Sequence, residues 1–123
     1  TWPIVSFDKD KTHQALMNVL SNAYKYSETG SRVICSMVAR HINGREEFGV
    51  SIEDHGIGMT RQELARVGER FYRADESGNT PGTGLGLALV NEIMAIQLGE
   101  VEIKSIKHKG TTVTLWFPTT SDI

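Results

Sequence analysis

Apolar residues recur every three to four positions between residues 9 and 27, which predicts an amphipathic α-helix. Four of them share one face: Leu16, Val19, Leu20 and Ala23. The opposite face carries three amides and an ammonium: Gln14, Asn18, Asn22 and Lys25. Asp8 precedes the pattern and is a residue type that caps helices, so we expect the helix to begin directly after it.

The polar face of this helix has an unusual composition. Solvated helix faces are normally built from Glu, Lys and Arg, whereas Asn lowers helix propensity because its side chain competes for backbone hydrogen bonds. Asn18 and Asn22 align with Lys25 in one row. Such a row can ligate a hard cation through amide oxygen and hold phosphate through the ammonium. An ordinary amphipathic helix with a wet side is the alternative, and the rest of the chain decides between the two.

Alternating patterns downstream predict strands. Residues 31–42 place Val33, Cys35, Met37 and Ala39 on one face, which predicts a strand with one better-buried face. We expect Cys35, the only cysteine, to be a small buried hydrophobe in a reducing compartment. Asn43-Gly44 is a strong signal for a two-residue hairpin turn. The returning strand, roughly 46–54, places Phe48, Val50, Ile52 and Asp54 on one side.

The remaining elements complete the predicted fold. They are a short strand at 3–7, a helix at 60–67 with Thr60 as cap and Glu63 as its partner, a helix at 85–97 ended by Gly99, and strands at 100–107 and 111–117 that turn at Lys109-Gly110. Residues 69–83 have no period, and a loop of that length is functional or disordered. The order of elements predicts an α/β two-layer sandwich, with a mixed, mainly antiparallel sheet covered on one face by three helices.

Length and charge limit the function classes. At 123 residues the chain is expected to form one domain, residues 1–123, that buries about two-thirds of its unfolded surface. Thirteen basic and fifteen acidic residues nearly balance, so we expect no nucleic-acid partner and no direct membrane contact. We find no signal peptide and no apolar run long enough to span a membrane, and expect a soluble piece. The chain opens at Thr1 without an initiator Met, which predicts an excised domain of a longer protein.

Asp54 ends a strand whose inward positions are apolar, so its carboxylate is expected to point toward the core. A buried carboxylate needs a partner, and capping a loop or pairing with an arginine are the structural alternatives. Gly56 and Gly58 follow it, however, and glycine permits close approach of backbone to a ligand. A buried acceptor beside a floor without side chains suits a flat ring with an exocyclic amine, such as adenine.

Two further segments are candidates for phosphate contacts. Gly82-Thr83-Gly84-Leu85-Gly86-Leu87 precedes a helix, where backbone N–H groups can face phosphate, although a flexible hinge is the alternative. It is not a Rossmann fingerprint, because Leu87 takes the third glycine position, and it is not a P-loop, because no Gly-Lys-Ser/Thr follows. In Arg70-Phe71-Tyr72-Arg73 the aromatics can simply anchor a loop, or Arg73 can reach a terminal phosphate.

Together, these four segments resemble the ATP-binding catalytic domain of sensor histidine kinases. That domain has the Bergerat-type fold shared with gyrase-type topoisomerases, mismatch-repair ATPases and heat-shock chaperones. The segments occur once each and in the family's order, and the resemblance runs from about Phe7 to Pro118, including Gly110-Thr111-Thr112. None of the four histidines lies in the family's phosphoacceptor motif, so the phosphoacceptor domain is expected to be absent from this chain.

The resemblance implies a role for each matching residue. The catalytic set would be Asn18, Asn22, Lys25 and Arg73, with Asn22 as the Mg²⁺ ligand. The ATP-binding set would be Asn22, Lys25, Tyr26, Asp54, Gly56, Gly58, Phe71, Arg73, Gly82, Thr83, Gly84, Leu85, Gly86 and Thr112. Within these sets Asp54 would accept the adenine amine, Phe71 would anchor an ATP lid at about 69–83, and Arg73 would reach the γ-phosphate.

The activity implied by the resemblance is transfer of the ATP γ-phosphoryl group to a histidine on a separate helical dimerisation domain of the same parent protein. A response regulator would be the indirect partner, in the cytoplasm, with a parent protein that can be membrane-anchored. Hydrolytic relatives place a Glu four residues before the metal-binding Asn, whereas here Asn18 is an amide that cannot take a proton from water. A hydrolytic ATPase and a nucleotide-binding signalling module with little or no catalysis are the alternatives.

Overall fold

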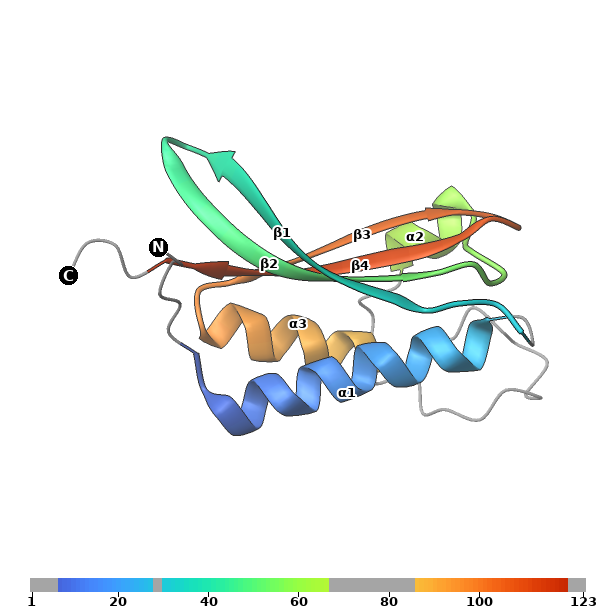
Figure 1. The fold of residues 1–123 in the computed structure, drawn as a ribbon, viewed down its shortest axis with the longest axis horizontal. Helices are drawn as coiled ribbons and strands as arrows, with labels where there is room; N and C mark the ends of the chain where they lie inside the picture. Colours follow the sequence, from blue (N-terminus) through green and yellow to red (C-terminus); the bar gives the residue numbers. More distant parts are fainter. Residues whose placement is uncertain (1–6, 28–29, 67–85, 120–123) are drawn as a thin grey trace.

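The computed structural model describes residues 7–27, 30–66 and 86–119 (Figure 1). Its elements are α1 (Lys9–Tyr26), β1 (Ile34–Ile42), β2 (Arg45–Asp54), α2 (Arg61–Arg66), α3 (Gly86–Ile96), β3 (Glu100–Ile106) and β4 (Gly110–Pro118). The helices and strands predicted in the described ranges are confirmed, with bounds shifted by at most three residues. The segment predicted as a lid, 69–83, and all but the last residue of the strand predicted at 3–7 lie outside the described residues.

Local signals in the sequence explain where two helices begin. The Asp8 carboxylate accepts the backbone N–H of Lys11 at 2.9 Å and so caps α1. At α2, the Thr60 hydroxyl accepts the N–H of Glu63 at 3.1 Å, and the Glu63 carboxylate accepts the N–H of Thr60 at 2.9 Å. This reciprocal pair is a capping box, as the sequence predicts.

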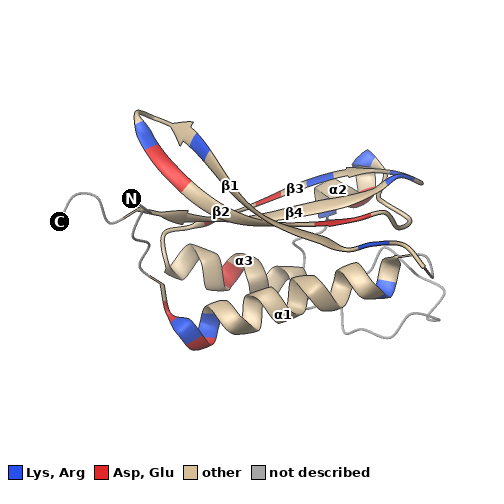
Figure 2. Cartoon of the chain, viewed as in Figure 1, with Lys and Arg blue, Asp and Glu red and all other residues tan. Residues whose placement is uncertain are grey.

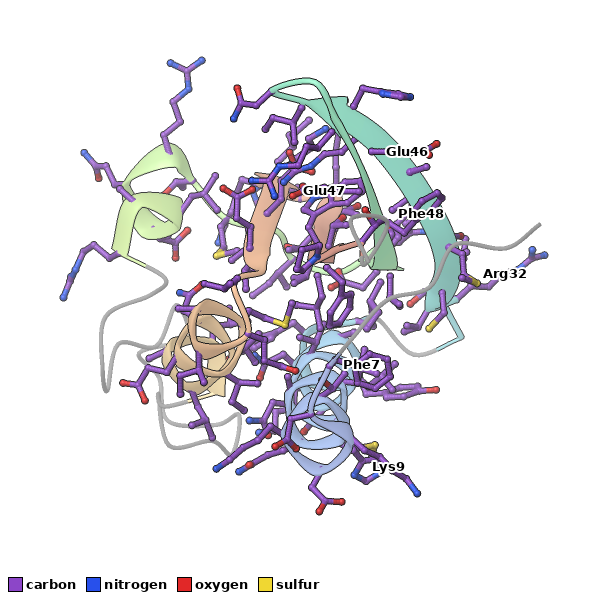
Figure 3. All side chains as sticks on the ribbon, turned by 90° about the vertical axis from the view of Figure 1, so that its left-hand side faces the viewer. Phe7, Lys9, Arg32, Glu46, Glu47 and Phe48 are labelled. Atoms are coloured by element: carbon purple, nitrogen blue, oxygen red, sulfur yellow. The ribbon has the colours of Figure 1, made fainter. Side chains whose placement is uncertain are left out.

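The four described strands form one sheet in the order β1-β2-β4-β3, and every pairing is antiparallel. The β1–β2 hairpin turns through Asn43 and Gly44 at φ values of 52° and 74°, the left-handed geometry for which this dipeptide is selected. Helices α1 and α3 pack against each other and cover one face of the sheet (Figures 1 and 3). Helix α2 buries none of its residues and lies by the β3–β4 turn, where Glu63 is 3.6 Å from Lys107. The predicted α/β two-layer sandwich is confirmed, although two of the predicted helices, α1 and α3, rather than all three cover the face of the sheet.

The hydrophobic core lies between the sheet and the α1–α3 layer. Its largest fully buried side chains come from both layers: Ile52, Met94, Leu115, Val19 and Val90. At the N-terminal end, the Phe7 ring packs at a centroid distance of 5.6 Å from that of Phe117, which fixes the chain where it enters α1 (Figure 3). No helix within the described ranges is long and apolar enough to cross a membrane.

The prediction that Cys35 is buried is wrong, because this thiol is exposed. Cys35 and Met37 pair in register with Ile52 and Val50, so they lie on the helix-facing side of the sheet as the alternation indicates. Strand β1 is at one edge of the sheet, however, and the helices contact mainly β2, β4 and β3. Met37 is therefore 72% exposed although its position in the pattern is that of a core residue.

On the opposite face of the sheet, one arginine covers a tryptophan. The Arg40 guanidinium lies 4.3 Å from the centroid of the Trp116 ring and pairs with Glu47 at 2.7 Å and with Glu100. These contacts join β1 to β2 and to β3 across the face of the sheet opposite α1 and α3. They explain why Trp116 is only 6% exposed there.

At the end of α3, a leucine rather than the expected glycine takes the left-handed conformation that follows the helix. Leu98, with φ 61°, takes the left-handed conformation after the helix, and Gly99 donates its N–H to the Met94 carbonyl at 2.8 Å. Gly99 is required for another reason, since a Cβ there would overlap the carbonyl oxygen of Trp116. The side chain of Gln97 accepts the N–H of Asp8 and ties the end of α3 to the start of α1.

We expect Leu115→Ala to lower the free energy of unfolding by about 2–5 kcal/mol, because it leaves a cavity between the two layers. Met37→Ala, an exposed position on β1, should change it by less than about 0.5 kcal/mol. Urea denaturation of both variants measures the difference. Similar losses would show that β1 is covered in solution and that the core extends to this edge strand.

Candidate functional site

The carboxylate of Asp54 lies at the end of β2 and is 8% exposed. Its Oδ1 accepts two backbone N–H groups, from Gly56 at 2.9 Å and from Thr111 at 3.2 Å. Among the described residues, Oδ2 has no hydrogen-bond partner. One oxygen is therefore fixed by the protein, and the other remains an acceptor for a ligand.

Burial raises the pKa of the Asp54 carboxyl above its ordinary value of 3.8, and the hydrogen bonds from Gly56 and Thr111 offset part of that rise. The raised pKa means that the fold disfavours the carboxylate here. A buried carboxylate with a raised pKa and one oxygen without a partner among the described residues is a candidate for function.

The two glycines after Asp54 let the loop pack against the protein's own backbone. A Cβ on Gly56 would overlap the carbonyl oxygen of Tyr26, and the same carbonyl accepts the N–H of Ile57 at 3.1 Å. Gly58 has φ 63°, and a Cβ there would overlap the carbonyl oxygen of Ile106. The loop thereby joins the end of α1 to the end of the sheet. Gly56 and Gly58 shape the surroundings of Asp54 through these contacts.

The amides of α1 do not lie opposite the buried face as the periodicity predicts. Asn18 and Asn22 are both half-buried and flank the buried stripe of Ala15, Val19 and Ala23. Neither amide has a hydrogen-bond partner among the described residues. Lys25 is exposed, and it is the only charged residue in the last turns of a helix whose middle carries none (Figure 2).

The fold brings part of the predicted site together. Tyr26, whose carbonyl contacts the Asp54 loop, lies four residues after Asn22, so the amide-bearing turns of α1 approach the end of β2. Gly86 begins α3. Six predicted site residues lie outside the described residues: Phe71, Arg73, Gly82, Thr83, Gly84 and Leu85.

The contact with Asp54 on β4 is made by Thr111, whereas the predicted site residue of this strand is Thr112. Thr111 pairs with Asp54 across the two strands, whereas Thr112 pairs with Glu53 and lies on the other face of the sheet. Behind Thr111, the Ser105 hydroxyl lies 2.8 Å from the Thr111 hydroxyl. The alternation of the last strand could have identified Thr111 once the partner of Asp54 was known.

Residues 7–121 match the family described as histidine kinase-, DNA gyrase B-, and HSP90-like ATPase. The chain belongs to this family. The chain, referred to below as the ATPase domain, is 40% identical over 117 residues to sensor histidine kinase WalK of Bacillus subtilis. The match covers 93% of the chain and 19% of WalK. It is also 40% identical over 116 residues to sensor histidine kinase YkoH of the same organism, covering 93% of the domain and 24% of YkoH.

Solved structures give the same assignment. The mycobacterial sensor histidine kinase MprB matches with a TM-score of 0.76 at 30% identity, covering 94% of the domain and 74% of that chain. A structure of full-length ShkA in complex with AMPPNP matches with a TM-score of 0.76 at 29% identity, covering 97% of the domain and 24% of that chain. The ATPase domain spans about a fifth to a quarter of the curated sensor kinases it matches.

We expect Gly56→Ala to lower the free energy of unfolding of the ATPase domain by about 3 kcal/mol, because the new Cβ overlaps backbone that cannot move aside locally. Gly30→Ala is the matched control. Gly30 has φ 87° with open space around it, so only the left-handed conformation costs energy, about 1 kcal/mol. Thermal and urea unfolding compare the two, and equal losses would contradict the close packing of the Asp54 loop on α1.

The Asp54 carboxyl should titrate above 3.8 in the native protein, which carbon-13 NMR of the side chain measures. Since its native pKa exceeds its unfolded pKa, the native state binds more protons between the two values. The free energy of unfolding therefore falls as pH rises through that interval. Asp54→Asn should abolish this step and be at least as stable as the wild type at pH 7. A native pKa below 3.8 would contradict the conclusion that burial disfavours the charged form of Asp54.

Proposed function

We propose that this ATPase domain binds Mg-ATP and transfers the γ-phosphoryl group to a histidine on a separate helical dimerisation and phosphoacceptor domain of the same parent protein. The observation that carries the proposal is the buried Asp54 carboxylate, which keeps one oxygen without a partner among the described residues. The kinship with proteins named sensor histidine kinases supports the reaction class.

In this proposal Asp54 recognises the adenine ring. Its Oδ1 is held by the N–H groups of Gly56 and Thr111, so Oδ2 has a fixed direction in which to accept the exocyclic amine. Tyr26 at the end of α1 would pack near the base, since its backbone contacts the same loop. A hydrogen bond to an ionised acceptor in a buried site is stronger than a neutral one, which suits a specificity contact.

The half-buried amides of α1 fit a metal–phosphate site. Asn22 offers a carbonyl oxygen without a protein partner in the described ranges, and amide oxygen suits Mg²⁺. The described residues hold no cluster of three His, Cys, Asp or Glu, so the metal would depend on Asn22 and on phosphate oxygens. Bound Mg²⁺ would neutralise phosphate charge. Asn18 would lie on the phosphate side and Lys25 would contact phosphate.

The proposal assigns the remaining contacts to the segment between α2 and α3. Phe71 would anchor a lid, and Arg73 would stabilise the charge of the γ-phosphate. Backbone N–H groups of the glycine-rich segment would face the phosphates where α3 begins: Gly82, Thr83, Gly84, Leu85 and Gly86. Thr112 was predicted as a nucleotide contact, but it pairs with Glu53 on the face of the sheet opposite Asp54, so Thr111 takes its place in this proposal.

The proposed transfer breaks the bond between the β,γ-bridging oxygen and the γ-phosphorus and forms a bond from that phosphorus to an imidazole nitrogen. Such transfers depend on positioning and charge neutralisation, and the partner's histidine supplies the nucleophile. This site therefore needs no base that activates water. Asn18 is neutral, and the only acidic residue of α1 is Asp10 in its first turn, which favours the kinase over a hydrolytic ATPase.

The proposed setting is the cytoplasmic part of a two-component sensor, with the phosphoacceptor domain as the direct partner and a response regulator as the indirect one. The parent protein can be membrane-anchored outside this domain. A nucleotide-binding signalling module without catalysis is the competing function, and it shares every binding contact proposed here. Phosphate transfer to a histidine-bearing domain from the same parent protein separates the two.

We expect Asp54→Asn to weaken ATP binding about 10- to 100-fold with or without Mg²⁺. Its amide keeps the acceptor for Gly56 and Thr111 but replaces the second acceptor with a donor. Asn22→Ala should remove mainly the Mg²⁺-dependent part of the affinity. Calorimetric titration of ATP with Mg²⁺ and with chelator measures both effects.

Two variants on exposed positions of α1, Asp10→Asn and Gln14→Ala, are the matched controls and should bind like the wild type. Small and equal effects of Asp54→Asn and Asn22→Ala would refute the site. Tight ATP binding without phosphorylation of the supplied histidine domain would refute the kinase and favour the signalling module.

A further inference from the structure

The Ser105 hydroxyl lies at the centre of a hydrogen-bond network next to Asp54. It accepts the backbone N–H of Met59 at 2.8 Å and donates to the carbonyl of Gly110 at 3.0 Å. It is also 2.8 Å from the hydroxyl of Thr111. Ser105 thus connects the loop that follows Asp54 with the turn between β3 and β4.

The direction of the third hydrogen bond follows from the other two. A serine hydroxyl has one proton and two acceptor lone pairs. The Gly110 carbonyl can only accept and the Met59 N–H can only donate, so these contacts use the proton and one lone pair. The remaining lone pair of Ser105 must then receive the proton of Thr111. The Thr111 oxygen is left with lone pairs only.

The direction of the hydrogen bond from Thr111 to Ser105 matters because Thr111 is the cross-strand partner of Asp54. The two residues pair in register, and the Thr111 N–H holds Oδ1 of the carboxylate. Thr111 is half-buried, and Oδ2 of Asp54 has no partner among the described residues. The ends of β2 and β4 therefore offer two acceptors and no hydroxyl proton at this point.

We propose that Ser105 is a positioning residue that keeps the Thr111 hydroxyl an acceptor and thereby selects purines with an exocyclic amine over purines with a carbonyl at the same ring position. The proposal rests on the proposed function, in which the base lies at Asp54. An acceptor-only surface matches the two protons of an amine. A carbonyl in the same position offers these acceptors no proton, and the nearest proton of such a base lies on the adjacent ring nitrogen.

The test compares ATP with inosine triphosphate, whose base carries a carbonyl in place of the adenine amine and an N–H in place of the adjacent acceptor nitrogen. In Ser105→Ala the Thr111 hydroxyl is free to rotate and donate, so the preference for ATP over inosine triphosphate should fall at least about fivefold. Ser105→Thr keeps a hydroxyl and should retain the wild-type preference. Ser51→Ala removes a half-buried serine from β2 and is the matched control. Calorimetric affinities for both nucleotides give the ratio.

Equal weakening of both nucleotides in Ser105→Ala, or an unchanged ratio, would overturn the proposal, since a merely structural role does not alter selectivity. If Ser105→Ala does not fold, Thr111→Val provides the same test, because it removes the hydroxyl and leaves the contacts of Ser105 with Met59 and Gly110. Its ratio should also fall, and an unchanged ratio would overturn the proposal. Failure of the proposed function itself looks different, because the wild type would then bind neither nucleotide or would not distinguish them.

Discussion

The hydrogen bond between the Tyr26 carbonyl and the Ile57 N–H holds the helical layer against the end of the sheet. It forms at the C-terminus of α1, where carbonyl groups have no partners within the helix, so it satisfies one of them as well as joining two layers. The contact exists only because Gly56 has no side chain. This bond, together with the packing of α1 on β2, keeps the two parts of the proposed nucleotide site together: the amides of α1 and the carboxylate of β2.

Asp54 shows how the domain combines stability with recognition. Two backbone N–H groups fix one carboxylate oxygen, and burial raises the pKa of the group. The buried environment therefore disfavours the charged form of this side chain. Functional sites are where such local conflicts with stability are expected.

Much of the fold could be predicted because its signals are local. The Asp8 cap, the Thr60–Glu63 capping box and the Asn43-Gly44 turn each depend on a few consecutive residues. The exposure of Cys35 could not be predicted in this way. Alternation identifies the face on which a residue lies, whereas burial also depends on whether a helix covers that strand, and β1 lies at the edge.

The candidate site likewise combines local features, which could be predicted, with contacts between distant residues, which could not. Asp54 and its glycines follow one another in the chain, so their juxtaposition was predictable, whereas the contact from Thr111 depends on a pairing across 57 positions of sequence. The half-burial of Asn18 and Asn22 was missed because α1 packs against α3 as well as the sheet, which widens its buried stripe. The sequence of α1 alone encodes neither its packing against α3 nor its packing against the sheet.

The exposed thiol on β1 has a practical consequence. Cys35 is the only cysteine of the chain, and it lies on a strand that pairs with β2 along its whole length. A maleimide dye or a nitroxide label would attach at this single native position without any engineered cysteine. Fluorescence or electron paramagnetic resonance could then follow how the rest of the domain moves relative to the sheet when nucleotide is added.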